Sequence, residues 1–168
     1  MVYANPSLSN FEIPENKASD VAFSSYLNGK EIASFTSGDL VSQSQNLWSN
    51  HFCKGSEQPV FISLNLETPL GLASFLANNA NFRKVYIPSS FNMNKVLTSI
   101  KTQQSTTIVV DQDLAEMEPP SSKSAELELA ELTQSVTKIV VAGNKRVGGS
   151  SLFKNARDFH TINPYTLQ

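Results

Sequence analysis

The sequence has few of the side chains from which catalytic and metal sites are built: its 168 residues include one cysteine, Cys53, and two histidines, His51 and His160. A single cysteine excludes an internal disulfide framework and fits a reducing compartment. Zinc requires three or four ligands, and neither histidine has neighbours at a metal-ligand spacing, so we expect no metal ion. On a helix, Cys53 would not face His51 two positions earlier. A buried small hydrophobe is the favoured interpretation of Cys53, and a Cys–His nucleophile would require a tertiary contact that the sequence does not reveal.

An excess of positive charge and a long apolar run are also missing. The formal net charge of −2 argues against a nucleic-acid-binding protein, which normally carries a basic excess. No apolar run approaches the roughly 20 residues that span a bilayer. The first fifteen residues lack the charged and apolar regions of a secretory or mitochondrial presequence. We therefore expect an intracellular protein without a membrane span; a mitochondrial location would require a signal that was cleaved or lies elsewhere.

The sequence does contain short apolar runs that alternate with helical patterns. The predicted strands cover residues 59–64, 84–88, 106–111 and 138–142. Between the first two strands, Thr68 is suited to the N-cap of a helix and Pro69 to its first position. Such alternation requires right-handed crossovers and a parallel sheet. We predict an α/β fold, with a mostly parallel sheet of four or five strands and helices on both faces.

A predicted hairpin precedes this pattern, in residues 22–36. Its two short strands flank Asn28 and Gly29, the strongest two-residue turn signal, because both central residues must take a positive φ. Thr36 or Ser37 can then cap a helix whose apolar side chains fall on one face.

Composition divides the chain into four parts. Residues 1–20 are an extended arm, which is either a disordered terminus or a segment that docks on another surface through its aromatic and apolar residues, among them Tyr3, Phe11 and Ile13. The parts that follow are an α/β subdomain at 21–114, an acidic linker at 115–126, and a completing segment at 127–168. The completing segment is expected to hold a helix, a strand, a glycine-rich loop, a short helix and a polar tail.

The order of these elements resembles a known family. The stretches "SYLNGKEIASFT", with its aromatic–Thr–x–x–Asp-Leu pattern, "PVFISLN", "LGLASFLAN" and "KVYIPSSFNMNKVLTSIKTQQSTTIVVD" are similar to the first subdomain of the adenylate-forming superfamily, which includes the acyl-CoA synthetases. The resemblance covers residues 24–114 and implies an enzyme-like scaffold. The family's phosphate loop is absent, and "LANNANFRKVYIP" has Asn and Arg where the family commonly has an Ala-Gly turn. No catalytic, cofactor-binding or metal-binding residue is therefore carried over to this sequence.

The loop Gly143–Ser151, "GNKRVGGSS", is the segment that most resembles a ligand site. Its spacing approaches that of a phosphate-binding P-loop, but Gly149 stands where the lysine of that motif belongs. Lys145 and Arg146 could compensate in part, and a following helix N-terminus would favour an anion. A basic connection at the edge of the sheet that contacts a neighbouring protein is the preferred interpretation; nucleotide binding is the alternative.

Four carboxylates follow the third predicted strand: Asp111, Asp113, Glu116 and Glu118. General acid–base catalysis needs a carboxyl group with a raised pKa in a cleft, and the sequence indicates no cleft here. A solvated linker accounts for these residues, and a surface for a basic or amphipathic partner is the better functional interpretation.

An enzyme-like fold pattern without identifiable catalytic residues leads to one functional expectation. We expect a non-catalytic accessory or structural subunit of a larger protein assembly, without a cofactor or a small-molecule substrate, whose partners are other protein subunits. By analogy with complexes that recruit small enzyme-derived subunits, a mitochondrial respiratory or ATP synthase complex is one candidate home. The alternative is a small nucleotide- or acyl-group-binding protein, or an enzyme, that uses the loop Gly143–Ser151.

Overall fold

The chain folds around a sheet in which most strands run parallel. The computed structural model describes residues 2–3, 19–54, 57–117, 121–143, 153 and 155–168. Within this part of the chain the strands are β1 (Val2–Tyr3), β4 (Val60–Ile62), β5 (Val85–Tyr86), β6 (Thr107–Asp111), β7 (Lys138–Ala142) and β8 (Asp158–Ile162), in the order β1-β5-β4-β6-β7-β8. Neighbouring strands from β5 to β8 pair in parallel, and β1 pairs antiparallel with β5 at one edge. The predicted α/β fold with a mostly parallel sheet is confirmed.

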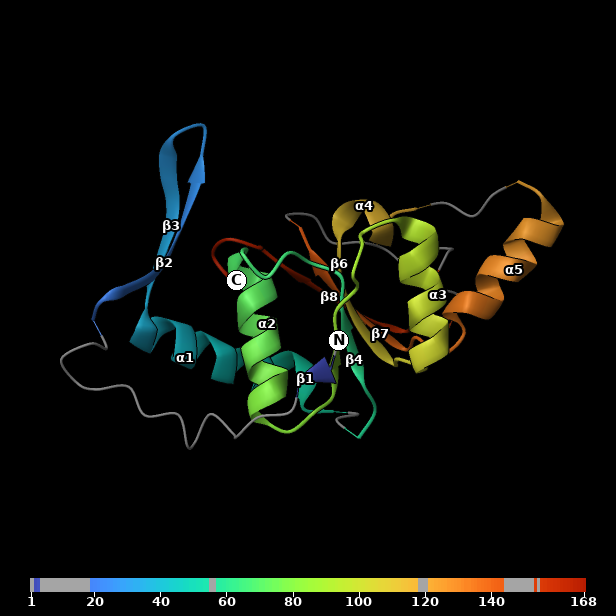
Figure 1. Ribbon diagram of the computed structural model, residues 1–168, viewed down its shortest axis with the longest axis horizontal. Coiled ribbons are helices and arrows are strands. Elements are labelled where there is room, and N and C mark those ends of the chain that lie inside the picture. The colour runs from blue at the N-terminus through green and yellow to red at the C-terminus, as the bar shows by residue number, and fades with distance from the viewer. Residues whose placement is uncertain (1, 4–18, 55–56, 118–120, 144–152, 154) are drawn as a thin grey trace.

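Helices cover both faces of this sheet (Figure 1). One face carries α1 (Ser37–Leu47), the π-helical turn η3 (Trp48–Phe52) and α2 (Pro69–Ala80), and the other carries α3 (Met93–Gln103), α4 (Gln112–Ala115) and α5 (Lys123–Thr133). Successive strand residues point to opposite faces, so Val109 of β6 packs with α1 and α2 and Val110 packs with α3. Burial on both faces explains why these strands are unbroken apolar runs in the sequence.

The hairpin forms where the turn signal placed it. Strands β2 (Val21–Leu27) and β3 (Lys30–Thr36) pair antiparallel as a two-stranded sheet separate from the main one. Asn28 has φ 52° and Gly29 has φ 76°, the positive values that a tight hairpin turn needs. Figure 1 shows the hairpin extending away from the main sheet, with its base at the start of α1.

Side-chain caps fix the starts of α1 and α2. The Thr36 hydroxyl accepts a hydrogen bond from the backbone N–H of Asp39 at 3.0 Å, and the Asp39 carboxylate accepts one from the backbone N–H of Thr36 at 3.2 Å. This reciprocal capping box selects Thr36 from the two predicted caps. Thr68 caps α2 by accepting from the backbone N–H of Gly71, and Pro69 occupies the first helical position, as predicted.

The segment after β7 differs from the prediction. Residues 158–162 were expected within a polar tail after a short helix, but they form the parallel edge strand β8, paired with β7 from Lys138↔Asp158 to Ala142↔Ile162. Residues 155–157 are not helical. In β8 the apolar side chains are few, yet Ile162 is buried and Phe159 packs on the core. The backbone ladder to β7 thus stabilises a strand that the polar sequence did not indicate.

The arm and the start of α5 have described contacts of their own. The arm was expected to dock on another surface or to be disordered, and this stays a prediction. Val2 and Tyr3 pair with Tyr86 and Val85 of this chain's own sheet, while Phe11 and Ile13 lie outside the described residues. Helix α5 follows Ser122, whose hydroxyl lies 3.0 Å from that of Ser124.

None of the helices in the described part of the chain has both the length and the apolar character needed to cross a bilayer.

Candidate functional site

The order of the strands creates a switch point between β4 and β6. From β4 the chain passes through α2 to β5 on one side, and from β5 it passes through α3 to β6 on the other side of β4. Because α2, which follows β4, and α4, which follows β6, lie on opposite faces of the sheet, the loops at the carboxyl ends of β4 and β6 separate. Ligands of doubly wound α/β proteins bind in the crevice at this position.

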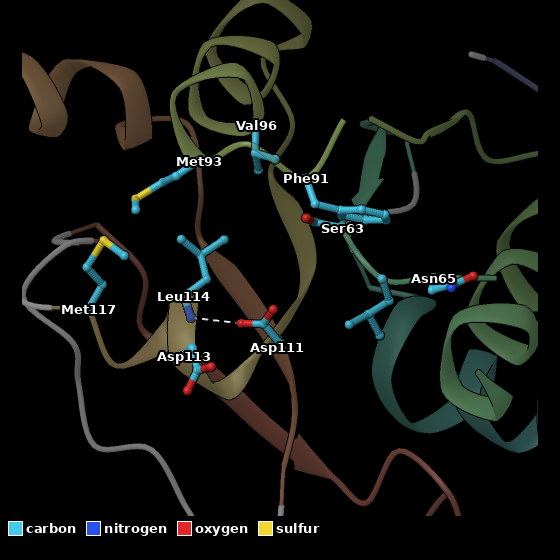
Figure 2. Close-up of a pocket in the computed structure, with 10 residues that line it drawn as sticks. Ser63, Asn65, Phe91, Met93, Val96, Asp111, Asp113, Leu114 and Met117 are labelled. Atoms are coloured by element: carbon cyan, nitrogen blue, oxygen red, sulfur yellow. Dashed lines mark hydrogen bonds between the residues drawn. The ribbon is translucent and has the colours of Figure 1, made fainter. Parts of the chain in front are cut away.

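A cleft of about 420 Å³ lies at this point, and Figure 2 shows the side chains around it. We call it the switch-point cleft. Its apolar lining consists of Leu64, Phe91, Met93, Val96, Leu114 and Met117. In Figure 2 the two methionines lie on one side of the cleft and Phe91 on the other, with the Leu114 side chain extending between them. Phe91 is 59% exposed and Met93 is 37% exposed, so apolar surface is left open to solvent at the cleft.

Polar residues at the ends of the two strands complete the lining. Ser63 and Asn65 follow β4, and Asp111 and Asp113 lie at the end of β6 and in α4. Oδ1 of Asp111 accepts a hydrogen bond from the backbone N–H of Leu114 at 2.8 Å, which caps α4 and fixes Leu114 beside the cleft. This carboxylate therefore has a structural role in addition to its place in the lining.

The loop after β4 is held by the start of α2. The carbonyl oxygen of Asn65 accepts a hydrogen bond from the Thr68 hydroxyl at 2.6 Å and one from the Thr68 backbone N–H at 3.0 Å. The Asn65 side-chain oxygen accepts from the backbone N–H of Glu67 at 2.9 Å. These local bonds fix the edge of the cleft that Asn65 forms.

The lining determines what the cleft can bind. Among the described residues that line it there is no lysine, arginine or histidine, so none of them could neutralise a phosphate. The expectation that the carboxylates after β6 lie away from any cleft was wrong, because Asp111 and Asp113 both line it. The strand order that places them there is not visible in the sequence. Glu116 instead accepts a hydrogen bond from Gln112 at 2.9 Å, and Glu118 lies outside the described residues.

The loop Gly143–Ser151 is described only at its first residue. Gly143 lies at the carboxyl end of β7, the same edge of the sheet as the cleft. A Cβ on Gly143 would meet the side-chain amide of Gln112 in α4, so a larger residue here would require that flexible side chain to move. Lys145, Arg146 and Gly149 lie outside the described residues, and the interpretation of this loop remains a prediction.

The two histidines, for which the sequence indicated no partners, meet near the amino ends of β7 and β8, away from the switch-point cleft. Nδ1 of His51, in η3, lies 2.6 Å from Nδ1 of His160, in β8, and Nε2 of His160 lies 2.7 Å from the Asp158 carboxylate. Lys138 donates a hydrogen bond to the His51 carbonyl oxygen at 2.9 Å and lies 3.6 Å from the Asp158 carboxylate. Strand β8, which was not predicted, brings these groups together, so the contact could not be anticipated from the sequence.

Cys53 lies near this cluster. It was expected to be buried, but it is exposed, and its thiol contacts the Ser49 carbonyl oxygen at 3.3 Å. Cys53, His51 and His160 line a small cavity of about 200 Å³. Over the described ranges, no three His, Cys, Asp or Glu side chains are grouped so that they could hold a metal ion.

The histidine contact predicts a pH dependence of stability. Burial, and to a lesser degree the charges of His160 and Lys138, lower the pKa of His51, while Asp158 acts in the opposite direction. A proton therefore binds His51 more readily in the unfolded chain than in the folded one, and this group's contribution to stability falls as pH decreases below about 6.5. We expect the urea midpoint to fall between pH 7.5 and 5.5, and to fall less steeply in His51→Gln. Equal slopes for the two proteins would show that His51 does not carry the effect.

Comparisons with known proteins address the fold. The fold is similar to part of an adenylate-forming enzyme. One matching structure is O-succinylbenzoate coenzyme A synthetase (MenE) from Bacillus subtilis, solved in complex with AMP, with a TM-score of 0.51 and 19% sequence identity. It covers 75% of this chain and 25% of that chain, so this chain spans about a quarter of the enzyme's length. No model of a known protein family and no curated protein sequence matches.

At this identity the similarity concerns the fold alone. It supports the resemblance inferred from the sequence for part of an acyl-CoA synthetase-like domain. That no catalytic residue of the family is carried over to this chain remains a prediction from the sequence.

Proposed function

We propose that this chain is a non-catalytic accessory subunit that binds other protein subunits of a larger assembly. The observation that carries the proposal is the exposed hairpin β2–β3. Val21 is 63% exposed and Tyr26 is 64% exposed, on a two-stranded element that extends away from the main sheet (Figure 1). An isolated hairpin is marginally stable in water, and tyrosine is among the residues that most often dominate protein–protein binding.

The base of the hairpin is well anchored, which favours a binding role over a loosely attached loop. Thr36 is both the last residue of β3 and the N-cap of α1. The backbone N–H of Ser37 donates to the Asp20 carbonyl oxygen at 3.1 Å, which joins the segment before β2 to the start of α1. A hairpin held at its base has less conformational freedom to lose on binding than a loosely attached loop has.

The lining of the switch-point cleft supports the non-catalytic part of the proposal. Covalent catalysis typically needs a nucleophile activated by an adjacent base. The described residues around the cleft include no histidine, cysteine or lysine. His51, His160 and Cys53 lie around a different, smaller cavity.

The partner assembly is proposed by analogy. A mitochondrial respiratory or ATP synthase complex is the candidate, because such complexes recruit small enzyme-derived subunits, and an intracellular, mitochondrial location belongs to the same proposal. Cell fractionation tests the location independently of binding.

Native purification from the source cells tests the subunit role. We expect a partner in a fixed stoichiometry. We expect the double variant Val21→Ser, Tyr26→Ser to reduce its recovery at least about tenfold, since loss of a hot-spot tyrosine costs about 2 kcal/mol or more. The matched control is Glu31→Gln, which alters the residue paired with Tyr26 across the hairpin without removing apolar surface. Recovery of only an 18.4 kDa monomer, or equal recovery with the double variant, would contradict the proposal.

A second candidate function is small-molecule binding, favoured by the position of the cleft at the switch point. In the form expected from the sequence, a nucleotide or acyl group would bind through the loop Gly143–Ser151. An increase in the unfolding temperature with ATP, AMP or CoA that is lost in the double variant Lys145→Ala, Arg146→Ala would favour this candidate over the subunit role.

A further inference from the structure

We propose that the switch-point cleft binds a small amphiphilic amine, a molecule with an apolar body and a protonated amino group. This inference concerns a ligand site separate from the hairpin and does not depend on the subunit role. It rests on three properties of the cleft: its position and volume, its apolar lining, and the charge at its polar side.

The position and volume are those of a small-molecule site. The cleft lies at the carboxyl ends of β4 and β6, where doubly wound proteins bind their ligands. Its volume of about 420 Å³ falls within the range of ligand pockets, roughly 300 to 1,000 Å³.

The apolar lining fits the body of such a ligand. Met93, on α3, and Met117, after α4, lie on the same side of the cleft (Figure 2). Methionine side chains adapt to the shape of an apolar group because they are unbranched and polarisable. The exposed Phe91 ring offers a flat surface on the other side. A ligand seated here would cover apolar surface that is now in contact with water.

The polar side of the cleft selects a cation. Oδ1 of Asp111 is engaged by the Leu114 N–H, and none of the described residues donates a hydrogen bond to its second oxygen, Oδ2, or to the Asp113 carboxylate. Because the described lining contains no positively charged side chain, these two carboxylates create a negative potential beside the apolar surface. A protonated amine is attracted to it, and a carboxylate or phosphate is repelled.

The hydroxyl of Ser63 and the amide of Asn65 lie in the same lining. They can accept hydrogen bonds from an ammonium group in addition to the carboxylates. The combination of apolar body and cationic head therefore satisfies both parts of the cleft, whereas a nucleotide or an anionic acyl group satisfies at most one.

Three matched probes test this assignment: n-octylamine, 1-octanol and octanoate, which share one alkyl chain and differ in the charge of the head group. The protein has three methionines, so labelling with methyl-13C methionine gives one NMR signal each for Met1, Met93 and Met117. Met93→Leu and Met117→Leu assign the two cleft signals. Titrations at pH 7 and below the micellar concentration of each probe then report on the cleft directly.

We expect octylamine to shift the Met93 and Met117 signals in a saturable way and to bind more tightly than octanol, with octanoate weakest. The double variant Asp111→Asn, Asp113→Asn keeps a capping side chain on α4. It should weaken octylamine binding about three- to tenfold, the effect of losing two partly solvated charge pairs, and leave octanol binding unchanged. Asp20→Asn, a carboxylate outside the cleft lining, is the control and should change neither. Octanoate binding as tightly as octylamine, no saturable shift of the cleft methionines, or equal octylamine affinity in the double variant would each overturn the proposal.

Discussion

Replacing Arg83 by alanine should lower the free energy of unfolding by about 3–5 kcal/mol. This is the largest effect that we expect from the loss of a polar side chain among the described residues. Arg83 is only 2% exposed. Its guanidinium donates hydrogen bonds to the carbonyl oxygen of Gln58 at 2.7 Å, to that of Phe52 at 3.0 Å and to the hydroxyl of Thr107 at 3.1 Å. Alanine would leave these acceptors without this donor, and the bonds to Phe52 and Thr107 are buried.

The position of Arg83 explains why no neighbour can replace it. The acceptors named above belong to the end of η3, the segment before β4 and the start of β6, so one planar side chain joins elements from both sides of the central strand. Burial lowers the pKa of Arg83 to about 10, which still leaves it charged at neutral pH. Lysine, a point donor on a flexible chain, does not reproduce the guanidinium fork, and Arg83→Lys should recover only part of the loss.

Urea denaturation of Arg83→Ala, Arg83→Met and Lys84→Ala measures these effects. Arg83→Met keeps most of the side-chain volume, so its loss reports on the hydrogen bonds rather than on a cavity. Lys84 is the exposed neighbour, and its substitution should change stability by less than about 0.5 kcal/mol. A loss below about 1 kcal/mol for both Arg83 variants would show that the hydrogen bonds do not stabilise the fold as the geometry indicates.

Gly71→Ala should destabilise the protein by about 2 kcal/mol, although alanine is normally the better helix former. Gly71 lies in the first turn of α2, where the helix propensity alone would favour alanine by roughly 1 kcal/mol. A Cβ at this position would lie 2.3 Å from the carbonyl oxygen of Asn65 and 2.9 Å from Oγ1 of Thr68. The first of these atoms is backbone and the second is the helix cap, so neither can move without breaking the bonds that hold the loop.

The same substitution should disturb the switch-point cleft, because Asn65 lines it. Gly29→Ala is the comparison: Gly29 has φ 76° with no atom within 4 Å of an added Cβ. It should therefore lose only the roughly 1 kcal/mol of left-handed backbone strain and leave the cleft unchanged. Unfolding midpoints and the Met93 and Met117 methyl signals measure both effects. A Gly71→Ala protein as stable as the wild type, with unshifted methionine signals, would contradict the close contact.

The elements predicted correctly are those whose causes lie within a few residues. Asn28 and Gly29 specify the hairpin through their own backbone angles, and Thr36 and Thr68 cap helices through hydrogen bonds to residues three positions later. Strand β8 shows the limit of such signals. Three of the five residues in its sequence, "DFHTI", are polar, and it becomes a strand because the exposed edge of β7 offers a backbone ladder.

The candidate site could be predicted only in part. The sequence singled out Asp111 and Asp113, but as members of a solvated linker, because nothing local indicates a cleft. The apolar residues opposite them, such as Phe91 and Met93, belong to a different loop and helix. Knowing that the two groups face each other requires the strand order, in which β6 lies beside β4 rather than beside β5.

By itself the sequence determined the α/β class, the hairpin, the two-sided burial of the strands and the starts of α1 and α2, because hydrophobic periodicity, capping and turn geometry act over short distances along the chain. Only the tertiary structure decided the contact between His51 and His160, which are 109 positions apart, the hydrogen bonds of Arg83 and the switch-point cleft. Each of these depends on which strands become neighbours and on which face each crossover helix packs. The packing of the whole sheet determines the strand neighbours and the helix faces, and they cannot be predicted from any short stretch of sequence.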